Sequence, residues 1–270
     1  MRDRYGRDIR CLRVSVTQAC NLRCSYCSAE GEGHGPGAST GHRLRRVLSL
    51  EEIASIASAA ARLGICKVRL TGGEPLLRPR LPDLVRLLKA IPHLEHVAMT
   101  SNGILLARAA ASLKAAGLDT VNVSLDTLSP ERFASITGGK LQAVLDGIEA
   151  AREAGIPVKI NMVVSPEGDA GERERVRAFC VSKGLGLQLI EQYELGREKI
   201  REPRFDRPHK CEQCDRIRLL ADGMLKPCLH SDLEVPVDFT DVERSLRECI
   251  EGKPERGEVC TNRRMVEIGG

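Results

Sequence analysis

Short apolar runs alternate with longer amphipathic runs along the chain up to about residue 193. The short runs have the length and composition of strands, and they lie at 12–17, 67–71, 96–100, 120–125, 158–164 and 185–190. The longer runs repeat apolar residues at helical spacing, and they lie at 53–63, 81–90, 107–116, 141–154 and 172–183. Because strands alternate with helices and several strands are almost entirely apolar, the pattern predicts an α/β fold with a covered parallel sheet.

The pattern changes near residue 193, where we place a boundary. Residues 194–210 are charged, contain proline and lack a clean period. The remainder holds cysteines, short strand-like pieces and one helical run at 242–250. The sequence therefore predicts two parts, a large one over residues 1–193 and a small one over residues 194–270.

Composition narrows the function classes. Hydrophobic residues make up 42% and charged residues 29% of the 270 residues, as in ordinary globular proteins. The net charge of +4 is spread along the chain and aromatics are only 3%, which argues against a nucleic-acid partner. No apolar run reaches the length of a membrane span and the first residues lack a signal-peptide pattern, so we expect a cytoplasmic protein with no membrane partner.

Eleven cysteines are unusual for such a protein, and without a secretion signal they favour metal ligation or redox chemistry over disulfides. Cys20, Cys24 and Cys27 follow the first predicted strand with the spacing Cys-x3-Cys-x2-Cys. Three thiolates this close can hold an iron–sulfur cube and leave one iron open to a small molecule. A zinc site with His34 as fourth ligand is the alternative.

A second cysteine group has the spacing Cys-x2-Cys-x13-Cys, with Cys211, Cys214 and Cys228. It again supplies three thiolates for a cluster. A zinc site completed by His209 or His230, or a redox-active cysteine pair, would use the same residues. The other five cysteines are interpreted as buried thiols or loop residues: Cys11, Cys66, Cys180, Cys249 and Cys260.

Cations interrupt several apolar strands. Arg13, Arg69 and Lys159 lie in predicted strands, and Arg216 and Arg218 alternate on another, so that both face the same side. A triphosphate needs several cations, and the guanidinium fork suits phosphate oxygens. Rim positions or salt bridges inside the fold are the alternative interpretation.

A glycine-rich loop, Thr71-Gly72-Gly73-Glu74-Pro75, follows the second predicted strand. Glycine suits a place where backbone must approach a ligand closely, although a Gly-Gly pair also occurs in a plain tight turn. Together with the first cysteine group, in which Tyr26 precedes the last cysteine, this loop resembles the radical S-adenosylmethionine (SAM) superfamily. Residues 211–228 and the terminal Ile268-Gly269-Gly270 resemble the MoaA family of GTP 3′,8-cyclases, and the likeness runs from about Cys11 to Gly270 with one gap.

The resemblance implies a partial (β/α)6 TIM-type barrel over residues 1–193, with an auxiliary-cluster segment over residues 194–270 that covers its open side. It implies SAM and two [4Fe–4S] clusters as cofactors, with the cluster ligands Cys20, Cys24, Cys27, Cys211, Cys214 and Cys228. The implied SAM contacts are Tyr26, Gly72, Gly73, Glu74, Ser124 and Tyr193. The implied substrate contacts are Arg13, Arg69, Thr100, Lys159, Arg216 and Arg218, and the residues important for catalysis are Arg216, Arg218, Gly269 and Gly270.

The implied activity is that of a lyase in molybdenum-cofactor biosynthesis. Reductive cleavage of SAM gives a 5′-deoxyadenosyl radical, which removes the 3′ hydrogen of GTP. The ribose radical then adds to guanine C8, and reduction of the resulting radical by one electron, with uptake of a proton, yields (8S)-3′,8-cyclo-7,8-dihydroguanosine 5′-triphosphate. An electron donor of the flavodoxin or ferredoxin type is implied, and a homodimer is a further expectation.

Three departures from that family bear on the substrate. Residues 194–210 replace a longer segment, Asp215 stands where the family usually has Asn, and Tyr193 stands where bacterial members often have Met. A radical SAM paralogue acting on another nucleotide or on a peptide is therefore the alternative. A third reading is an iron–sulfur or zinc sensor without catalysis, which would not need the glycine loop or Ser124.

Overall fold

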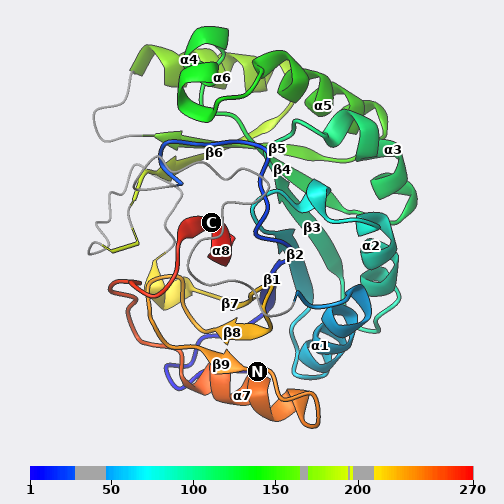
Figure 1. The fold of residues 1–270 in the computed structure, drawn as a ribbon, viewed down its shortest axis with the longest axis vertical. Helices are drawn as coiled ribbons and strands as arrows, with labels where there is room; N and C mark the ends of the chain where they lie inside the picture. The colour runs from blue at the N-terminus through cyan, green and yellow to red at the C-terminus, as the bar shows by residue number, and fades with distance from the viewer. Residues whose placement is uncertain (28–46, 165–169, 194, 197–209, 270) are drawn as a thin grey trace.

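The architecture is a curved parallel sheet with helices on its outer face (Figure 1). The computed structural model describes residues 1–27, 47–164, 170–193, 195–196 and 210–269. Over these residues the strands form one nine-stranded sheet in the order β6-β5-β4-β3-β2-β1-β7-β8-β9. The strands are β1 (Cys11–Ser15), β2 (Lys67–Thr71), β3 (His96–Ser101), β4 (Thr120–Ser124), β5 (Val158–Val164), β6 (Gly186–Glu191), β7 (Arg216–Leu219), β8 (Met224–Lys226) and β9 (Val235–Pro236).

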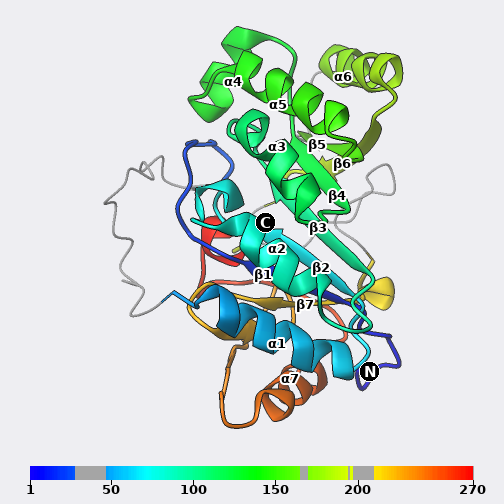
Figure 2. The same cartoon turned by 90° about the vertical axis from the view of Figure 1, so that its right-hand side faces the viewer.

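The helices that connect the first six strands pack along the outside of the sheet, as Figure 2 shows for α1, α2, α3 and α5. The helices are α1 (Leu50–Arg62), α2 (Leu81–Lys89), α3 (Leu106–Ala115), α4 (Pro130–Thr137), α5 (Leu141–Glu153), α6 (Ala170–Lys183), α7 (Val242–Glu251) and α8 (Met265–Ile268), with 3₁₀ turns η1 (Pro75–Leu77) and η2 (Cys211–Gln213). A capping box begins α1, in which Ser49 and Glu52 exchange hydrogen bonds.

The six predicted strands and the five predicted helices between them are confirmed, with small shifts at their ends. The pattern missed α4, although the sequence carries its start signal. Ser129 caps its first turn by accepting from the Arg132 amide, and Pro130 occupies the first helical position. Within the described residues, no helix is both long and apolar enough to cross a membrane.

The C-terminal part joins the barrel edge to edge. β7 pairs in parallel with β1, and the turn at Ala221-Asp222-Gly223 then reverses the chain into β8. Ile217, Leu219 and Leu225 belong to the same apolar core as Leu12 of β1. The segment therefore extends the barrel sheet as well as contributing residues to its open side.

Candidate active site

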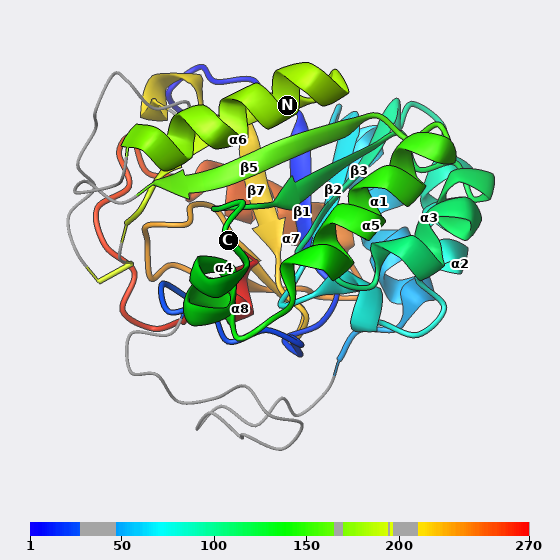
Figure 3. The same ribbon diagram turned by 90° about the horizontal axis from the view of Figure 1, so that it is seen from above.

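A single cavity inside the curve of the sheet collects most of the residues that the sequence singled out. Figure 3 shows that α8 and the loop after β1 lie at the same end of the sheet, where the parallel strands finish and barrel enzymes place their sites. Sixteen of the expected residues line this cavity: Arg13, Cys20, Cys24, Tyr26, Cys27, Arg69, Gly72, Gly73, Thr100, Ser124, Tyr193, Cys211, Cys214, Arg216, Arg218 and Cys228.

Four expected residues are not part of that lining. Lys159 lies early in β5, beside Gly186 of β6, and does not reach the cavity. Glu74 is fully buried behind its loop, and Gly269 contacts the site only through its backbone. Gly270 lies outside the described residues.

The loop with the first cysteine group rests on the helix that the sequence pattern missed. The amides of Arg23 and Ser25 donate to the carbonyls of Thr137 and Ile136, over 2.8 and 2.9 Å, at the end of α4. These hydrogen bonds use carbonyls that a helix end leaves unsatisfied. α4 therefore positions the backbone between Cys20 and Cys27.

The cysteine sets fit iron–sulfur clusters in their donor chemistry. Cys24 and Cys27 hydrogen-bond to each other, which raises the pKa of Cys24 and lowers that of Cys27, toward the thiolate that metals bind. Gly257 leaves room beside Cys228, since a Cβ there would lie 2.7 Å from its sulfur. Among the described residues, no three cysteine, histidine or carboxylate side chains converge on a single metal ion, whereas the thiolates of a [4Fe–4S] cluster bind separate irons.

The glycine loop packs against the loop that leads to Cys20. The Gly73 amide donates to the Thr17 carbonyl over 2.9 Å, and the Glu74 amide donates to the Ala19 carbonyl over 2.8 Å. A Cβ on Gly72 would lie 2.4 Å from the Thr17 carbonyl oxygen, and one on Gly73 would lie 2.3 Å from that of Ala19. Glycine is therefore required here for the contact between two loops, a reason that the sequence alone did not supply.

Glu74 joins the glycine loop to the end of β3. Its carboxylate accepts hydrogen bonds from the Leu76 amide (3.0 Å), the Ser101 hydroxyl (2.9 Å) and the Asn102 amide (2.7 Å). Burial raises the pKa of Glu74 to about 7, because the charged form loses its hydration. The side chain thus fixes the loop geometry from behind the cavity.

We expect this raised pKa to appear as a pH-dependent stability. The unfolded Glu74 loses its proton near pH 4.5 and the folded one near pH 7, so the free energy of unfolding should fall by up to about 3 kcal/mol between these values and then level off. Denaturant titrations of the metal-free protein at several pH values measure it. The Glu74→Gln protein cannot titrate there and should lack this component, so an unchanged slope would contradict the assignment.

Tyr26 is held in place by a buried carboxylate. Its hydroxyl donates to Asp126 over 2.7 Å, and the Val163 amide donates to the other oxygen of that carboxylate over 2.7 Å. Burial raises the pKa of Asp126 to about 6, and burial together with the Asp126 charge raises the pKa of Tyr26. The phenol of Tyr26 is therefore neutral and held in a fixed position, where it lines the cavity next to the cysteine loop.

Three arginines form a row across the floor of the site. Arg13 of β1 is in register with Arg69 of β2 on one side and with Arg218 of β7 on the other, and all three line the cavity. Burial lowers the pKa of both Arg69 and Arg218, and the buried Nη1 of Arg69 has no hydrogen-bond partner among the described residues. Because like charges on neighbouring strands repel, this row favours an anionic ligand.

Arg216 lies one step earlier on the same face of β7 and carries a partner of its own. The carboxylate of Asp215 lies 3.4 Å from its Nε, and the Asp215 carbonyl accepts from the amides of Arg10 and Cys11. The acidic residue noted in the sequence therefore partly neutralises Arg216.

Several lining residues escaped the sequence analysis. The side-chain amide of Asn122 donates to the side-chain oxygen of Asn161 over 3.1 Å, and the signal available in the sequence was their polar character within apolar strands. Arg7 and Lys253 gave no such signal. Arg7 donates to the Cys211 carbonyl, and the buried Lys253 donates to the Arg216 and Pro227 carbonyls, so both brace the second cysteine group.

Tyr193 and His230 close one side of the cavity together. Their ring centroids are 5.2 Å apart, with the planes tilted by 52°. His230 is buried, and it immediately follows the Pro-Cys-Leu run of the second cysteine group. The aromatic pair thus links the end of the barrel to the C-terminal part.

Sequence comparison places the chain among known enzymes. The profile of the radical SAM superfamily matches residues 14–180. The GTP 3′,8-cyclase of Listeria monocytogenes is 34% identical over 336 aligned positions, covering all of this chain and 99% of the relative. That of Alkaliphilus oremlandii is 35% identical with full coverage of both, and that of Petrotoga mobilis is 38% identical over 87% of this chain and 85% of the relative.

Structural comparison agrees at the level of the fold. SuiB of Streptococcus suis bound to SAM matches with a TM-score of 0.67 at 14% identity, over 92% of this chain and 64% of that protein. Native anSMEcpe with bound SAM matches with a TM-score of 0.66 at 14% identity, over 91% and 81%. Since the cyclase relatives match along the whole chain, the protein belongs to the radical SAM superfamily and, within it, to the GTP 3′,8-cyclase family.

Proposed function

We propose that this protein cleaves SAM reductively and cyclises GTP to (8S)-3′,8-cyclo-7,8-dihydroguanosine 5′-triphosphate. The assignment of GTP as substrate rests on the in-register row of Arg69, Arg13 and Arg218. Three guanidinium groups at neighbouring in-register positions offset most of the negative charge of a triphosphate, and each can pair with phosphate oxygens. The cyclase relatives support the same substrate.

The two cysteine groups that line the cavity would each hold a [4Fe–4S] cluster. The first consists of Cys20, Cys24 and Cys27 in the loop after β1, and the second of Cys211, Cys214 and Cys228 in the C-terminal part. When bound, the first cluster would supply the electron for SAM cleavage, and the second group of three thiolates would leave one ligand position of its cluster for the substrate. In this proposal residues 1–193 form the catalytic barrel and residues 194–270 the auxiliary segment.

The protein's own groups bind, orient and shield the reactants. Gly72 and Gly73 present backbone to the methionine end of SAM, while Tyr26, Ser124 and Tyr193 line the space around it. Thr100 lies at the end of β3 on the substrate side. Orientation in an enclosed cavity is the main contribution a protein makes when a cofactor performs the bond cleavage.

Further partners are part of the proposal. A flavodoxin or ferredoxin type protein would deliver the electron, which requires an approach to the cluster from the protein surface. We also propose a cytoplasmic location, since both clusters and free thiols persist in a reducing compartment. A homodimer is retained as a hypothesis, to be tested by the mass of the protein in solution.

An anaerobic assay tests the function. The reconstituted protein is incubated with SAM, dithionite and GTP, and 5′-deoxyadenosine is followed together with any GTP isomer that acid converts to a fluorescent pterin. Both products are expected. Formation of 5′-deoxyadenosine without GTP conversion would reject GTP and direct the search to other nucleotides or to peptides, and no SAM cleavage would favour a non-catalytic sensor.

Removing one arginine of the row should weaken substrate binding specifically. We expect Arg69→Gln to raise the KM for GTP about tenfold to a hundredfold, because a charge-assisted hydrogen bond contributes about 1.5–3 kcal/mol. Steady-state kinetics measure it, with cluster iron unchanged. Arg108→Gln removes an exposed charge from α3 and is the matched control. An unchanged KM for GTP in the Arg69 variant would show that the arginine row does not bind the substrate.

A further inference from the structure

The C-terminal tail forms part of the cavity wall, but its short helix would not be stable by itself. Met265 and Val266 of α8 line the cavity, and Gly269 packs so closely on β2 that a Cβ there would lie 2.5 Å from Thr71 Cγ2. α8 spans only Met265–Ile268, and a helix of this length is unstable by itself. Its position must therefore come from contacts on either side.

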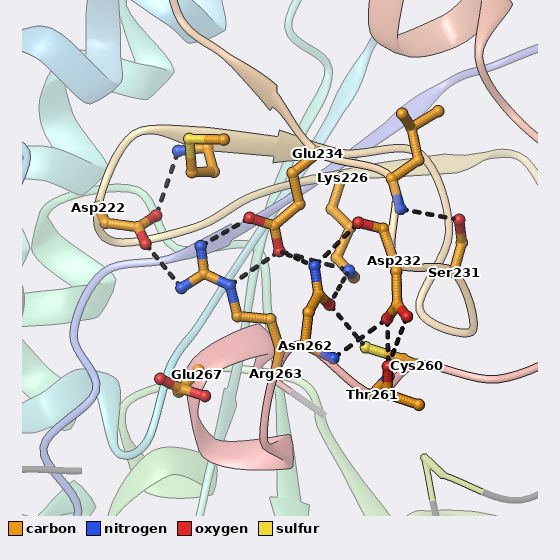
Figure 4. Close-up of polar contacts among 12 residues, drawn as sticks. Asp222, Lys226, Ser231, Asp232, Glu234, Cys260, Thr261, Asn262, Arg263 and Glu267 are labelled. Atoms are coloured by element: carbon orange, nitrogen blue, oxygen red, sulfur yellow. Dashed lines mark hydrogen bonds and ion pairs between the residues drawn. The ribbon is translucent and has the colours of Figure 1, made fainter. Parts of the chain in front are cut away.

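A polar network outside the cavity supplies those contacts, and Arg263 is at its centre (Figure 4). The Arg263 side chain is 10% exposed, and its Nη1 donates to Asp222 over 2.7 Å. Its Nε and Nη2 donate to the two oxygens of Glu234 over 2.8 and 2.7 Å. A bidentate pair fixes direction as well as distance, so Arg263 sets the angle at which the chain enters α8.

The residues just before Arg263 are fixed to the same surface. The amide and hydroxyl of Thr261 donate to Asp232 over 2.7 and 2.6 Å, and the Asn262 side chain donates to the Asp232 carbonyl over 2.8 Å. The fully buried Lys226 of β8 donates to Asn262 over 3.2 Å. The base of the tail is thus attached to the β8–β9 region.

The β7–β8 hairpin, which carries Asp222 in its turn, also holds the end of the tail. Arg218 of β7 donates to the carbonyls of Gly269 (2.8 Å) and Ile268 (3.3 Å), and Asp222 lies in the turn that follows β7. The tail is therefore fixed to the β7–β8 hairpin at two points, outside the cavity through Arg263 and inside it through Arg218. We propose that Arg263 is a positioning residue, which sets the tail so that the Gly269 carbonyl holds Arg218 in the arginine row.

Loss of Arg263 should loosen the tail whatever the substrate is. Its expected effect on SAM cleavage and GTP conversion rests on the proposed function. Without Arg263, α8 should detach more often, and Arg218 should lose the acceptor that orients it. The tail would then open beside Thr71 and Gly72, and Arg218 would be less well oriented for the nucleotide. The expected signature is wasteful SAM cleavage, with more 5′-deoxyadenosine formed per GTP consumed.

Hydrogen exchange of the cluster-loaded protein without nucleotide is the first measurement. In Arg263→Gln, the amides of residues 265–269 should exchange at least about tenfold faster than in the wild type, because the tail opens locally. Arg263→Lys should recover part of the protection, since one ammonium can pair with one carboxylate. Arg86→Gln breaks an exposed ion pair with Asp83 on α2 and serves as the matched control.

The second measurement is the ratio of 5′-deoxyadenosine to cyclised product, expected to rise severalfold in Arg263→Gln and to return partway in Arg263→Lys. Unchanged exchange in Arg263→Gln would overturn the proposal, and so would faster exchange with an unchanged ratio. Faster exchange in a protein that never converts GTP would support the tail anchor and reject the proposed function. If Arg263→Gln does not fold, Glu234→Gln weakens the same anchor from the other side and is read in the same way.

Discussion

Replacing Cys24 by alanine should abolish SAM cleavage. Cys24 lies in the loop held by α4, lines the cavity and hydrogen-bonds to Cys27, so its loss removes one of three thiolates from the first cluster. We expect 5′-deoxyadenosine to fall below detection under reducing conditions. The iron content should fall from about eight to about four atoms per chain, because the second cysteine group is untouched.

The control for this change is another thiol. Cys180 on α6 is buried in the apolar core and lies away from both cysteine groups in the sequence. Cys180→Ala should keep SAM cleavage near the wild-type rate at a small cost in stability. Normal SAM cleavage by the Cys24 variant would end the catalytic assignment of the first cysteine group. The four retained irons would show that the variant has folded.

Replacing Gly73 by alanine should disturb the packing of the glycine loop against the loop that leads to Cys20. The new Cβ would lie 2.3 Å from the Ala19 carbonyl oxygen and 2.7 Å from that of Gln18, and both are backbone atoms that cannot rotate away. The loop that leads to Cys20 must therefore move. Overpacking of this kind costs about 1–3 kcal/mol, which corresponds to a fall in Tm of roughly 2–12 °C for a chain of this size.

The loop displacement should also weaken SAM binding, since Gly73 and Cys20 line the same cavity. We expect an increase of at least about tenfold in the Kd of SAM, measured by equilibrium binding to the cluster-loaded protein. Gly196→Ala places a methyl group where no atom of the described residues lies within 4 Å, and it should change neither Tm nor affinity. A Gly73 variant with wild-type Tm and Kd would show that the two loops do not pack as described.

Local sequence was sufficient where a few neighbouring residues carry the chemistry. The two cysteine groups could be found from spacing, and the glycine loop and Tyr26 from the resemblance to the radical SAM superfamily. The structure brings Cys20 and Gly73 to one cavity. The strand and helix order was also readable, because a parallel sheet covered by helices imposes two clear periods on the sequence. α4 was missed although its cap, Ser129-Pro130, was visible.

Sequence alone was a weaker guide to the role of a side chain where that role depends on whether the side chain is buried or reaches the cavity. Glu74 belongs to the glycine loop and was assigned to SAM, yet its carboxylate is fully buried against Ser101 and Asn102. Lys159 interrupts an apolar strand in the same way as Arg69, but only Arg69 reaches the cavity. Sequence spacing tells which face of a strand a residue occupies, whereas its height in the barrel depends on strand register and on neighbouring loops.

The sequence by itself determined the cluster-binding chemistry and the alternating α/β order, because both depend on contacts between residues close in the chain. Only the tertiary structure decided that Arg218 stands beside Arg13, since that contact requires β7 to pair with β1 across some two hundred residues. The anchor of Arg263 between Asp222 and Glu234 is of the same kind. No local pattern encodes such contacts, because they form only when the sheet has closed around its core and separate segments are buried together.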